Sequence, residues 1–372
     1  MAHSYTPGLK VLKNTEILKE RRLPLKGQVE SKTGDVVKPD DVVANTDLPG
    51  NVQMINVANL LNADASDIEN YMIKGKGELI EKDGLLAETK GLFGFFKSSV
   101  LSPVSGTIES ISTVTGQVVL RESPIPVEVD AYIEGEIDGV IPEEGVVIKT
   151  NGVFIQGIFG IGGESRGEIQ SIVEGRASEI TEDMISADLK GKIIVGGSFI
   201  SLGAYKKAIS CEVAGVVVGG FNYYDLEEIL GYTLGVAITG SEDLITSLIV
   251  TEGYGKIQMG QQTFDLLSSH SGMLASINGA TQIRAGVIRP EIIIPNRDVA
   301  TQEEGSETLG ITQGSLVRVI RSPNFGKIGT VTDLPPELRK MESETMVRIA
   351  IIDIDGTQFE IPRSNLEVVE TD

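Results

Sequence analysis

The sequence predicts a β-rich, multidomain chain in which one small parallel α/β domain lies between two β modules. Its 43 glycines follow the spacing of β-turns, and aromatic residues make up only 5% of the chain, so Val, Ile and Leu must fill the cores. From residue 190 onward, short apolar strands alternate with helical segments, which indicates parallel pairing through crossovers. A chain of 372 residues can form two or three domains with separate cores.

Charge and composition disfavour several classes of protein. A net charge of −21 repels phosphate backbones and anionic membranes, so binding of either would need a local basic patch. A single cysteine, Cys211, excludes an intrachain disulfide, and two histidines, His3 and His270, leave little for a histidine metal site. There is no signal-peptide core and no window of about 18 apolar residues. We therefore expect a cytoplasmic protein without a membrane span.

Residues 1–26 form a basic leader in this acidic chain. Cations outnumber the two glutamates here, and they are Lys10, Lys13, Lys19, Arg21, Arg22 and Lys26. Two interpretations stay open: a solvated arm, or an arm that docks on an acidic surface of a neighbouring subunit through charge complementarity.

Residues 27–185 are predicted to form a β-rich domain in which one pattern occurs twice. The first copy, 27–50, reads GQVESKTGDVVKPDDVVANTDLPG, and the second, 75–150, begins GKGELIEKDGLLAETK and continues through SPVSGTIES. A short apolar strand, a Lys-Pro or Lys-Asp turn and another apolar strand recur in both. The pattern resembles the half-motif of lipoyl- and biotinyl-type barrel-sandwich hybrid domains. Residues 56–74 between the copies predict a helical insertion that Asp64 or Ser66 can cap.

Some barrel-sandwich domains carry a covalent cofactor on a lysine at a hairpin tip, and here the resemblance points to Lys90. The insertion that follows it contains Phe93, Phe95 and Phe96, unlike a solvent-facing carrier tip. Exposed aromatic clusters usually mark a contact surface, whereas the alternative places these rings in the core. The sequence is therefore more similar to a non-carrier domain, such as that of the C subunit of the Rnf electron-transport complex, and we expect no cofactor.

Residues 186–295 are predicted to form the small α/β domain. Two glycine pairs, Gly196-Gly197 and Gly219-Gly220, end predicted parallel strands and precede helices, where open α/β sheets bind anions. They are weak anion-site candidates, and we favour the alternative that they allow tight turns and close packing. Polar residues within an apolar stretch nearby indicate an internal network, a ligand site or a subunit interface; they are Asn278, Gln282, Arg284 and Arg289.

Two side chains in this region resemble catalytic groups, but both have simpler interpretations. His270 in SSHSG faintly resembles the motif of phosphohistidine domains, yet it ends a predicted helix, where a histidine is favoured by the helix dipole. Cys211 lies among apolar residues of a predicted helix, as a small buried hydrophobe does. We predict no catalytic residue and no metal site.

Residues 296–312 are polar and acidic and predict a linker, and residues 313–372 predict a C-terminal β module. The stretch GSLVRVIRSPNFGKIGTVTDLP resembles a KOW motif, which implies an SH3-like barrel, and a hairpin turn is expected at Asp355-Gly356. Arg318, Arg321 and Lys327 are candidate interaction residues. Protein contact is favoured over RNA because nucleic-acid platforms usually carry several aromatic residues.

These observations together predict a non-enzymatic structural or assembly protein that acts through protein partners and forms a homo-oligomer. One alternative is an electron-transport or carrier accessory protein similar to the Rnf C subunit. A second alternative is an RNA- or ribosome-associated factor, in which only the KOW-like module would contact nucleic acid.

Overall fold

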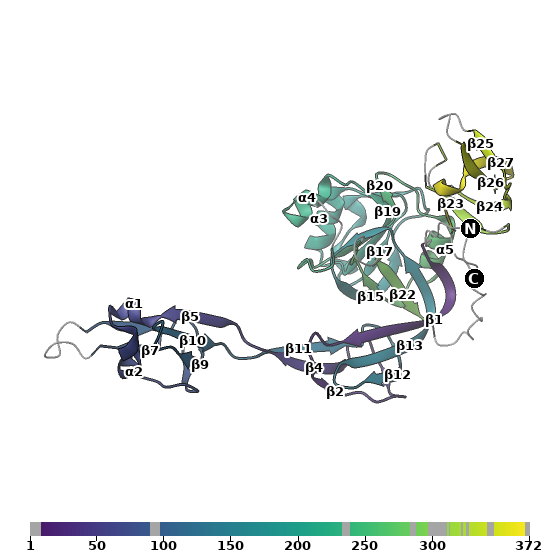
Figure 1. Ribbon diagram of the computed structural model, residues 1–372. Helices are drawn as coiled ribbons and strands as arrows, with labels where there is room; N and C mark the ends of the chain where they lie inside the picture. The colour runs from purple at the N-terminus through teal and green to yellow at the C-terminus, as the bar shows by residue number, and fades with distance from the viewer. Residues whose placement is uncertain are drawn as a thin grey trace.

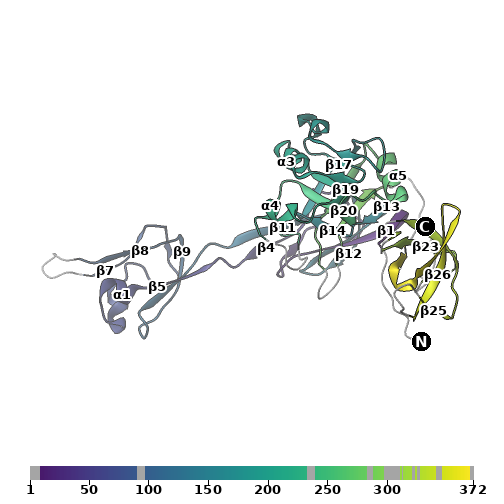
Figure 2. The same ribbon diagram turned by 90° about the horizontal axis from the view of Figure 1, so that it is seen from above.

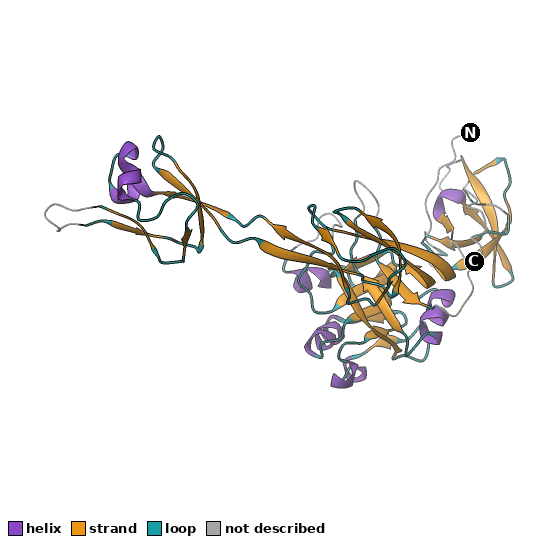
Figure 3. Ribbon diagram, turned by 90° about the horizontal axis from the view of Figure 1, so that it is seen from below, coloured by secondary structure: helices purple, strands orange, loops and turns teal. Residues whose placement is uncertain are grey.

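The computed structural model describes residues 9–89, 97–232, 239–282, 288–296, 311, 313–320, 323–324, 327–340 and 346–368. The chain forms a central body, a long arm that projects from it, and a C-terminal module on the other side of the body (Figures 1 and 2). Strands run through all three parts, whereas the helices are short (Figure 3). The predicted β-rich, multi-sheet character is therefore confirmed.

One large sheet forms the body, and its order is β14-β20-β19-β17-β15-β21-β22-β13-β12-β3, with β1 also paired to β13. Its strands are β1 (Val11–Arg22), β3 (Val36–Val37), β12 (Gly135–Ile141), β13 (Gly145–Gln156), β14 (Phe159–Ile161), β15 (Glu164–Ser171), β17 (Ile193–Val195), β19 (Gly215–Phe221), β20 (Ser247–Tyr254), β21 (Leu274–Asn278) and β22 (Glu291–Pro295). The sheet curves until the chain that follows β13 meets strand β20 at the other end of the strand order. Gly157, just after β13, donates its N–H to Pro290 O at 2.8 Å, and Ile158 donates to Val250 O in β20 at 2.9 Å.

Strands β17, β19 and β20 of the predicted α/β segment pair in parallel, as predicted, and β15 before the segment joins them. The later strands of the segment, β21 and β22, pair antiparallel instead. Successive residues of β17 face opposite sides: Ile194 packs in the core under α3 (Leu202–Ser210) and α4 (Asp225–Leu230), and Ile193 packs in the core that includes α5 (Gln261–Ser269). A separate parallel pair is formed by β16 (Glu179–Ile180) and β18 (Phe199–Ile200). Both sides of β17, β19 and β20 are thus buried, which explains their continuous apolar sequences.

The structure differs from the predicted boundary at residues 185 and 186. β15 lies before that boundary and pairs with β17 beyond it, and β13 pairs with β22. The body is therefore one unit built from both predicted domains. The polar sequence of β15, ESRGEIQS, carried no apolar signal for this long-range pairing.

The basic leader is also not a free arm. Its residues 11–22 form β1, which runs antiparallel to β13 from Val11 opposite Ile155 to Arg22 opposite Gly145. Buried positions such as Val11 and Ile17 alternate in part with exposed, charged ones. Several of the leader's cations therefore pair with acidic groups of this chain, among them Arg22 with Glu144.

The arm begins as a two-stranded ribbon and ends in a distal module. The ribbon pairs β4 (Val42–Leu48) with β11 (Ile125–Asp130), and β2 (Gln28–Val29) lies beside β4. The distal module contains β5 (Val52–Asn56), α1 (Val57–Leu61), α2 (Ile68–Tyr71), β6 (Leu79–Ile80), β7 (Leu85–Glu88), β8 (Ser99–Leu101), β9 (Gly106–Ile111) and β10 (Gln117–Arg121). It has a core of its own around Ile68, Leu86 and Ile108. The predicted helical insertion is present, and Asp64 caps a short 3₁₀ turn within it.

The distal module repeats the hydrogen bonding of the arm's base. At the base, Gly34 donates to Ile137 O at 2.8 Å, and Ala131 donates to Asp41 O at 2.9 Å. In the distal module, bonds at matching positions join Gly77 to Ile108 O at 2.7 Å and Ser102 to Gly84 O at 2.9 Å. The two copies are therefore nested, because the strands of the first copy, residues 34–48 and 125–141, enclose the second, residues 77–111.

Nesting corrects the predicted extent of the repeat, which assigned residues 75–150 to the second copy. Residues 125–141 belong to the first copy, since β4 pairs with β11 and β3 pairs with β12. In the second copy, β7 pairs with β8 and β6 pairs with β9. The distal module thus lies where the hairpin tip of the first copy would be.

The C-terminal module is a six-stranded sheet with a core around Val317, Val331 and Ile352. Its strands are β23 (Leu316–Val319), β24 (Ile328–Asp333), β25 (Leu338–Lys340), β26 (Met346–Ile354), β27 (Thr357–Pro362) and β28 (Leu366–Val368). The hairpin turn predicted at Asp355-Gly356 is confirmed, with φ of +51° and +80° between the paired strands β26 and β27.

Candidate interaction surfaces

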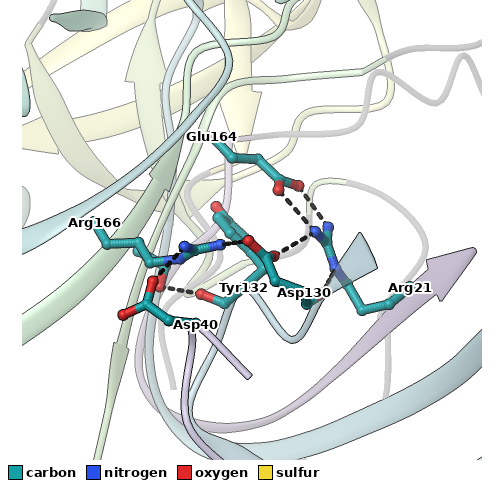
Figure 4. A network of polar contacts seen from close by, with 7 residues as sticks. Arg21, Asp40, Asp130, Tyr132, Glu164 and Arg166 are labelled. Carbon is teal, nitrogen blue, oxygen red and sulfur yellow. Dashed lines mark hydrogen bonds and ion pairs between the residues drawn. The ribbon is translucent and has the colours of Figure 1, made fainter. Parts of the chain in front are cut away.

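Ion pairs fix the base of the arm to the body (Figure 4). Arg21 of β1 donates to both carboxylate oxygens of Glu164, at 2.6 and 2.8 Å, and its Nε donates to Asp130 O at 2.7 Å. Arg166 of β15 donates to Asp40 Oδ1 at 2.6 Å and also to the Asp130 carboxylate. Asp130 ends the ribbon strand β11, so the network joins the leader, the ribbon and the body sheet.

Tyr132 lies directly beneath this network and is fully buried. The Arg21 guanidinium lies 5.2 Å from the centre of its ring and the Lys19 amine 5.7 Å. Burial, reinforced by the negative charges of Glu291 and Glu164, raises the pKa of the Tyr132 hydroxyl well above its usual value. With its φ of +65°, Tyr132 marks a sharp bend where the ribbon enters the body. The direction of the arm is therefore set by a tightly packed junction.

The outer face of the distal sheet exposes apolar side chains at the far end of the arm. Met54 is 69% exposed and Leu79 is 67% exposed, and they lie on the two edge strands, β5 and β6. Between them, Arg121 of β10 donates to the Glu109 carboxylate at 2.7 Å. Exposed apolar side chains that share one face can contribute to a protein contact surface.

The predicted carrier lysine, Lys90, and the predicted contact residues Phe93, Phe95 and Phe96 lie outside the described residues. The strands before and after them are described. Thr89 donates its N–H to Ser98 O at 2.9 Å, which continues the antiparallel pairing of β7 and β8.

The geometry of the glycine pairs supports close packing rather than anion binding. All four glycines are buried. A Cβ on Gly197 would lie 2.5 Å from Gly175 O, and one on Gly219 would lie 2.1 Å from Ile257 O. A Cβ on Gly196 would meet the Ile180 side chain, and one on Gly220 would meet Gly255 O. The N–H groups of Gly196 and Gly219 donate to Val217 O and Gly197 O, so they are not available to an anion.

Arg318, predicted as an interaction residue, is buried between the C-terminal module and the body. Its Nη1 lies 3.1 Å from Glu252 Oε2 of β20 and 4.0 Å from Glu367 Oε2 of β28. Glu252 also accepts the N–H of Gly260 at 2.8 Å. Burial raises the pKa of Glu367 despite the attraction of Arg318. Arg318 therefore joins two modules of one chain, and sequence reasoning missed Glu252, a charge inside the apolar strand SLIVTEGY.

The two other basic candidates of this module differ from Arg318. Lys327 is exposed, and its amine lies 5.3 Å from the centre of the Phe359 ring. Arg321 lies outside the described residues.

A cationic ribbon lies at the edge of the C-terminal module, where β25 pairs with β26. Leu338 pairs with Arg348 and Lys340 with Met346, so all four side chains lie on one face. All four are exposed, Leu338 by 53% and Met346 by 54%. The face therefore combines two cations, Lys340 and Arg348, with two apolar side chains.

A tyrosine platform, formed by Tyr223, Tyr224 and Tyr254, lies at the carboxyl ends of β19 and β20. Their exposed fractions are 37%, 83% and 45%. The Tyr223 ring meets Tyr224 at a centroid distance of 5.8 Å and Tyr254 at 5.1 Å, edge to face in both cases. The sequence analysis did not identify this surface. The adjacent residues Tyr223 and Tyr224, after a glycine-rich strand, were the signal that could have identified it.

The remaining candidates have local structural roles. His270 ends α5, with Nδ1 2.8 Å from Leu266 O. Cys211 ends α3 and is half-buried against the core, more exposed than expected. Asn278 accepts the N–H of Ala280 at 2.9 Å, a turn contact, and Arg284 lies outside the described residues.

The part of the chain that the structure describes contains neither a metal-ligand cluster nor a helix that could span a membrane. Those residues contain no cluster of three or more His, Cys, Asp or Glu side chains placed to hold a metal ion. No helix among them has the length and apolar character needed to cross a membrane. No protein-family model matches the chain, and no curated protein matches its sequence.

Proposed function

We propose that the protein is a non-enzymatic assembly protein of the cytoplasm that self-associates and contacts other copies through separate surfaces on its arm, body and C-terminal module. The observation that carries this proposal is the arm itself. A distal module with exposed Met54 and Leu79 is held away from the body by a ribbon whose base is fixed by ion pairs. A building block needs contact surfaces that face different directions. The projecting arm carries one such surface at its far end.

The resemblance to barrel-sandwich hybrid domains and to the KOW-like, SH3-type barrel forms part of this proposal. Nested copies of one hydrogen-bonding pattern support the former, and the compact β23–β28 sheet supports the latter. Both scaffolds commonly serve as docking blocks. The burial of Arg318 against Glu252 also favours protein contact over RNA, because it removes one cation from any nucleic-acid surface.

Light scattering after size exclusion tests the proposal on the full chain at micromolar concentration. Self-association predicts a mass that is a multiple of 39.7 kDa, whereas a monomer would contradict it. In an armless variant, an Asn-Gly turn joins Leu48 directly to Ile125 in place of residues 49–124. These two residues form the last pair of the ribbon, so a tight turn can close it. We expect smaller assemblies from the armless variant.

A milder variant tests the exposed face of the distal module without removing the arm. Met54→Ser with Leu79→Ser keeps the distal core, because both side chains are mainly exposed. If the outer face contacts another copy, this variant reduces the mass of the assembly in the same way as removal of the arm. An unchanged mass would assign the self-association to other surfaces.

One observation favours a second candidate, a carrier accessory protein similar to the Rnf C subunit. In sequence, Lys90 lies between β7 and β8, the paired strands of a hairpin that the resemblance identifies with the carrier tip. Intact-mass measurement of protein from its native cells discriminates between the two. A lipoyl or biotinyl adduct on Lys90 would support the carrier, and an unmodified mass supports the assembly protein.

A further inference from the structure

Strand β5 forms one edge of the distal sheet, and half of its backbone hydrogen-bonding groups point away from that sheet. In the part of the chain that the structure describes, β5 pairs with β10 on one side and with no strand on the other. Glu122 donates its N–H to Asn51 O at 2.9 Å, and the alternation that follows directs the backbone groups of Gln53 toward β10. The N–H and C=O groups of Val52 and Met54 therefore point outward from the edge.

β5 lacks the features that usually protect an edge strand. A charged side chain, a proline or a very short length commonly prevents such a strand from pairing with another chain. Among the described edge strands of four or more residues, β5 alone has neither a proline nor a charged residue; the others are β1, β7, β11 and β27. Residues 48–63 contain no charged side chain at all, although charged residues make up 23% of the chain.

We propose that β5 pairs antiparallel with β5 of a second copy around a two-fold axis, so that the two distal sheets become one continuous sheet. This inference rests on the self-association proposed above and identifies one contact that produces it. The axis passes between the two copies of Gln53, which places Val52 of one copy opposite Met54 of the other. These two residues exchange N–H to C=O hydrogen bonds, and their side chains, 46% and 69% exposed, pack together on the outer face.

The hydrogen-bonding pattern explains why the occupant is a second copy. A two-fold axis turns each outward N–H of an antiparallel edge toward an outward C=O of the same edge in the other copy. The strand is therefore complementary to itself. The chosen register also sets an apolar side chain opposite an apolar side chain, and no charge is buried because the segment contains none.

The position of the edge reduces the repulsion between two copies that each carry a net charge of −21. The distal module lies at the end of the arm, away from the body (Figures 1 and 2). Exposed charges more than about 8 Å apart are largely screened at physiological salt, and pairing through the arms keeps the two bodies at opposite ends of the pair. A two-fold contact closes on itself, so this contact alone gives a dimer.

A charge placed on the edge tests the pairing without disturbing the core. Met54→Lys replaces a mainly exposed side chain and brings two like charges into one strand pair, so we expect self-association to weaken about tenfold or more in sedimentation equilibrium. Val114→Lys makes the same change of charge at an 87% exposed position in the turn between β9 and β10. This matched control should leave the affinity unchanged.

Disulfide cross-linking tests the register. In a Cys211→Ser background, Gln53→Cys places two thiols opposite each other across the axis, at a pair without mutual hydrogen bonds, where antiparallel strands approach most closely. Oxidised glutathione should convert this variant to a covalent dimer on a denaturing gel, whereas Val114→Cys in the same background should stay a monomer.

Two results would separate the edge pairing from the proposed function. An oligomeric wild type whose affinity is unchanged in Met54→Lys, or whose Gln53→Cys variant cross-links no faster than Val114→Cys, would overturn the edge pairing alone. A wild type that is monomeric throughout would leave the edge to a strand of another protein, and it would overturn both the pairing and the proposed function.

Discussion

Replacing Arg318 with methionine should detach the C-terminal module from the body. The Arg318 side chain is 6% exposed, the Glu252 side chain 2% and the Glu367 side chain 8%. Arg318→Met keeps the length and apolar stem of the side chain but leaves the buried Glu252 carboxylate without the cation that lies 3.1 Å from it. Breaking a buried ion pair from one side costs about 3–5 kcal/mol, because the remaining charge is uncompensated. We expect a loss of that size in the free energy of unfolding of the module.

A double variant provides the control for this loss. In Arg318→Met with Glu252→Gln, the glutamine oxygen can still accept the N–H of Gly260, and no unpaired charge remains at that position. Replacing a buried pair by neutral groups is often close to neutral, so we expect this variant to lie within about 1 kcal/mol of the wild type. The double variant should therefore be more stable than the single one.

Urea unfolding followed by circular dichroism measures the loss, and hydrogen exchange at the Gly260 amide reports the junction itself. That amide donates to Glu252, so its protection should fall in the single variant and recover in the double. The reasoning is refuted if Arg318→Met costs less than about 1 kcal/mol, or if the double variant is as unstable as the single one.

Two further predictions concern pH and packing. Burial raises the folded-state pKa of Glu367 above its unfolded value, so the ionised carboxylate opposes folding, and this penalty disappears as the pH falls through the folded pKa. In urea titrations, Glu367→Gln should therefore stabilise the protein at pH 7 but not at pH 4. A loss of stability at pH 7 would contradict this. Gly220→Ala places a Cβ 1.9 Å from Gly255 O, whereas the Cβ of Gly139→Ala meets nothing within 4 Å. Thermal unfolding should show that Gly220→Ala lowers the free energy of unfolding by about 1–3 kcal/mol and that Gly139→Ala changes it by no more than about 0.5 kcal/mol. Equal costs would show that Gly220 is not packed as described.

Local patterns in the sequence predicted local structure well. The turn at Asp355-Gly356 and the parallel strands around Ile193 and Val217 are present because turn residues and continuous apolar runs act over a few positions. A repeat within the predicted copies is also present as matching hydrogen bonds, but these bonds align Gly34 with Gly77 and not Gly27 with Gly75.

Contacts between distant parts of the chain were not predictable in the same way. The sequence analysis interpreted the segment of β1 as a basic leader because of its charges. Its pairing with β13 could not be read from the local pattern, since β13 lies more than a hundred residues away. The same holds for Arg318, whose burial depends on Glu252 in another module. The tyrosine platform depends on Tyr254 at the end of β20 reaching Tyr223 after β19, which only the parallel pairing of these strands brings about.

The mass of the intact chain in solution tests the central claim most directly. Mass photometry or sedimentation equilibrium across a dilution series should show species larger than 39.7 kDa that dissociate as the protein is diluted and as salt screens the charged contacts. A single species of 39.7 kDa at every concentration and salt would contradict an assembly protein built from this arm, body and C-terminal module.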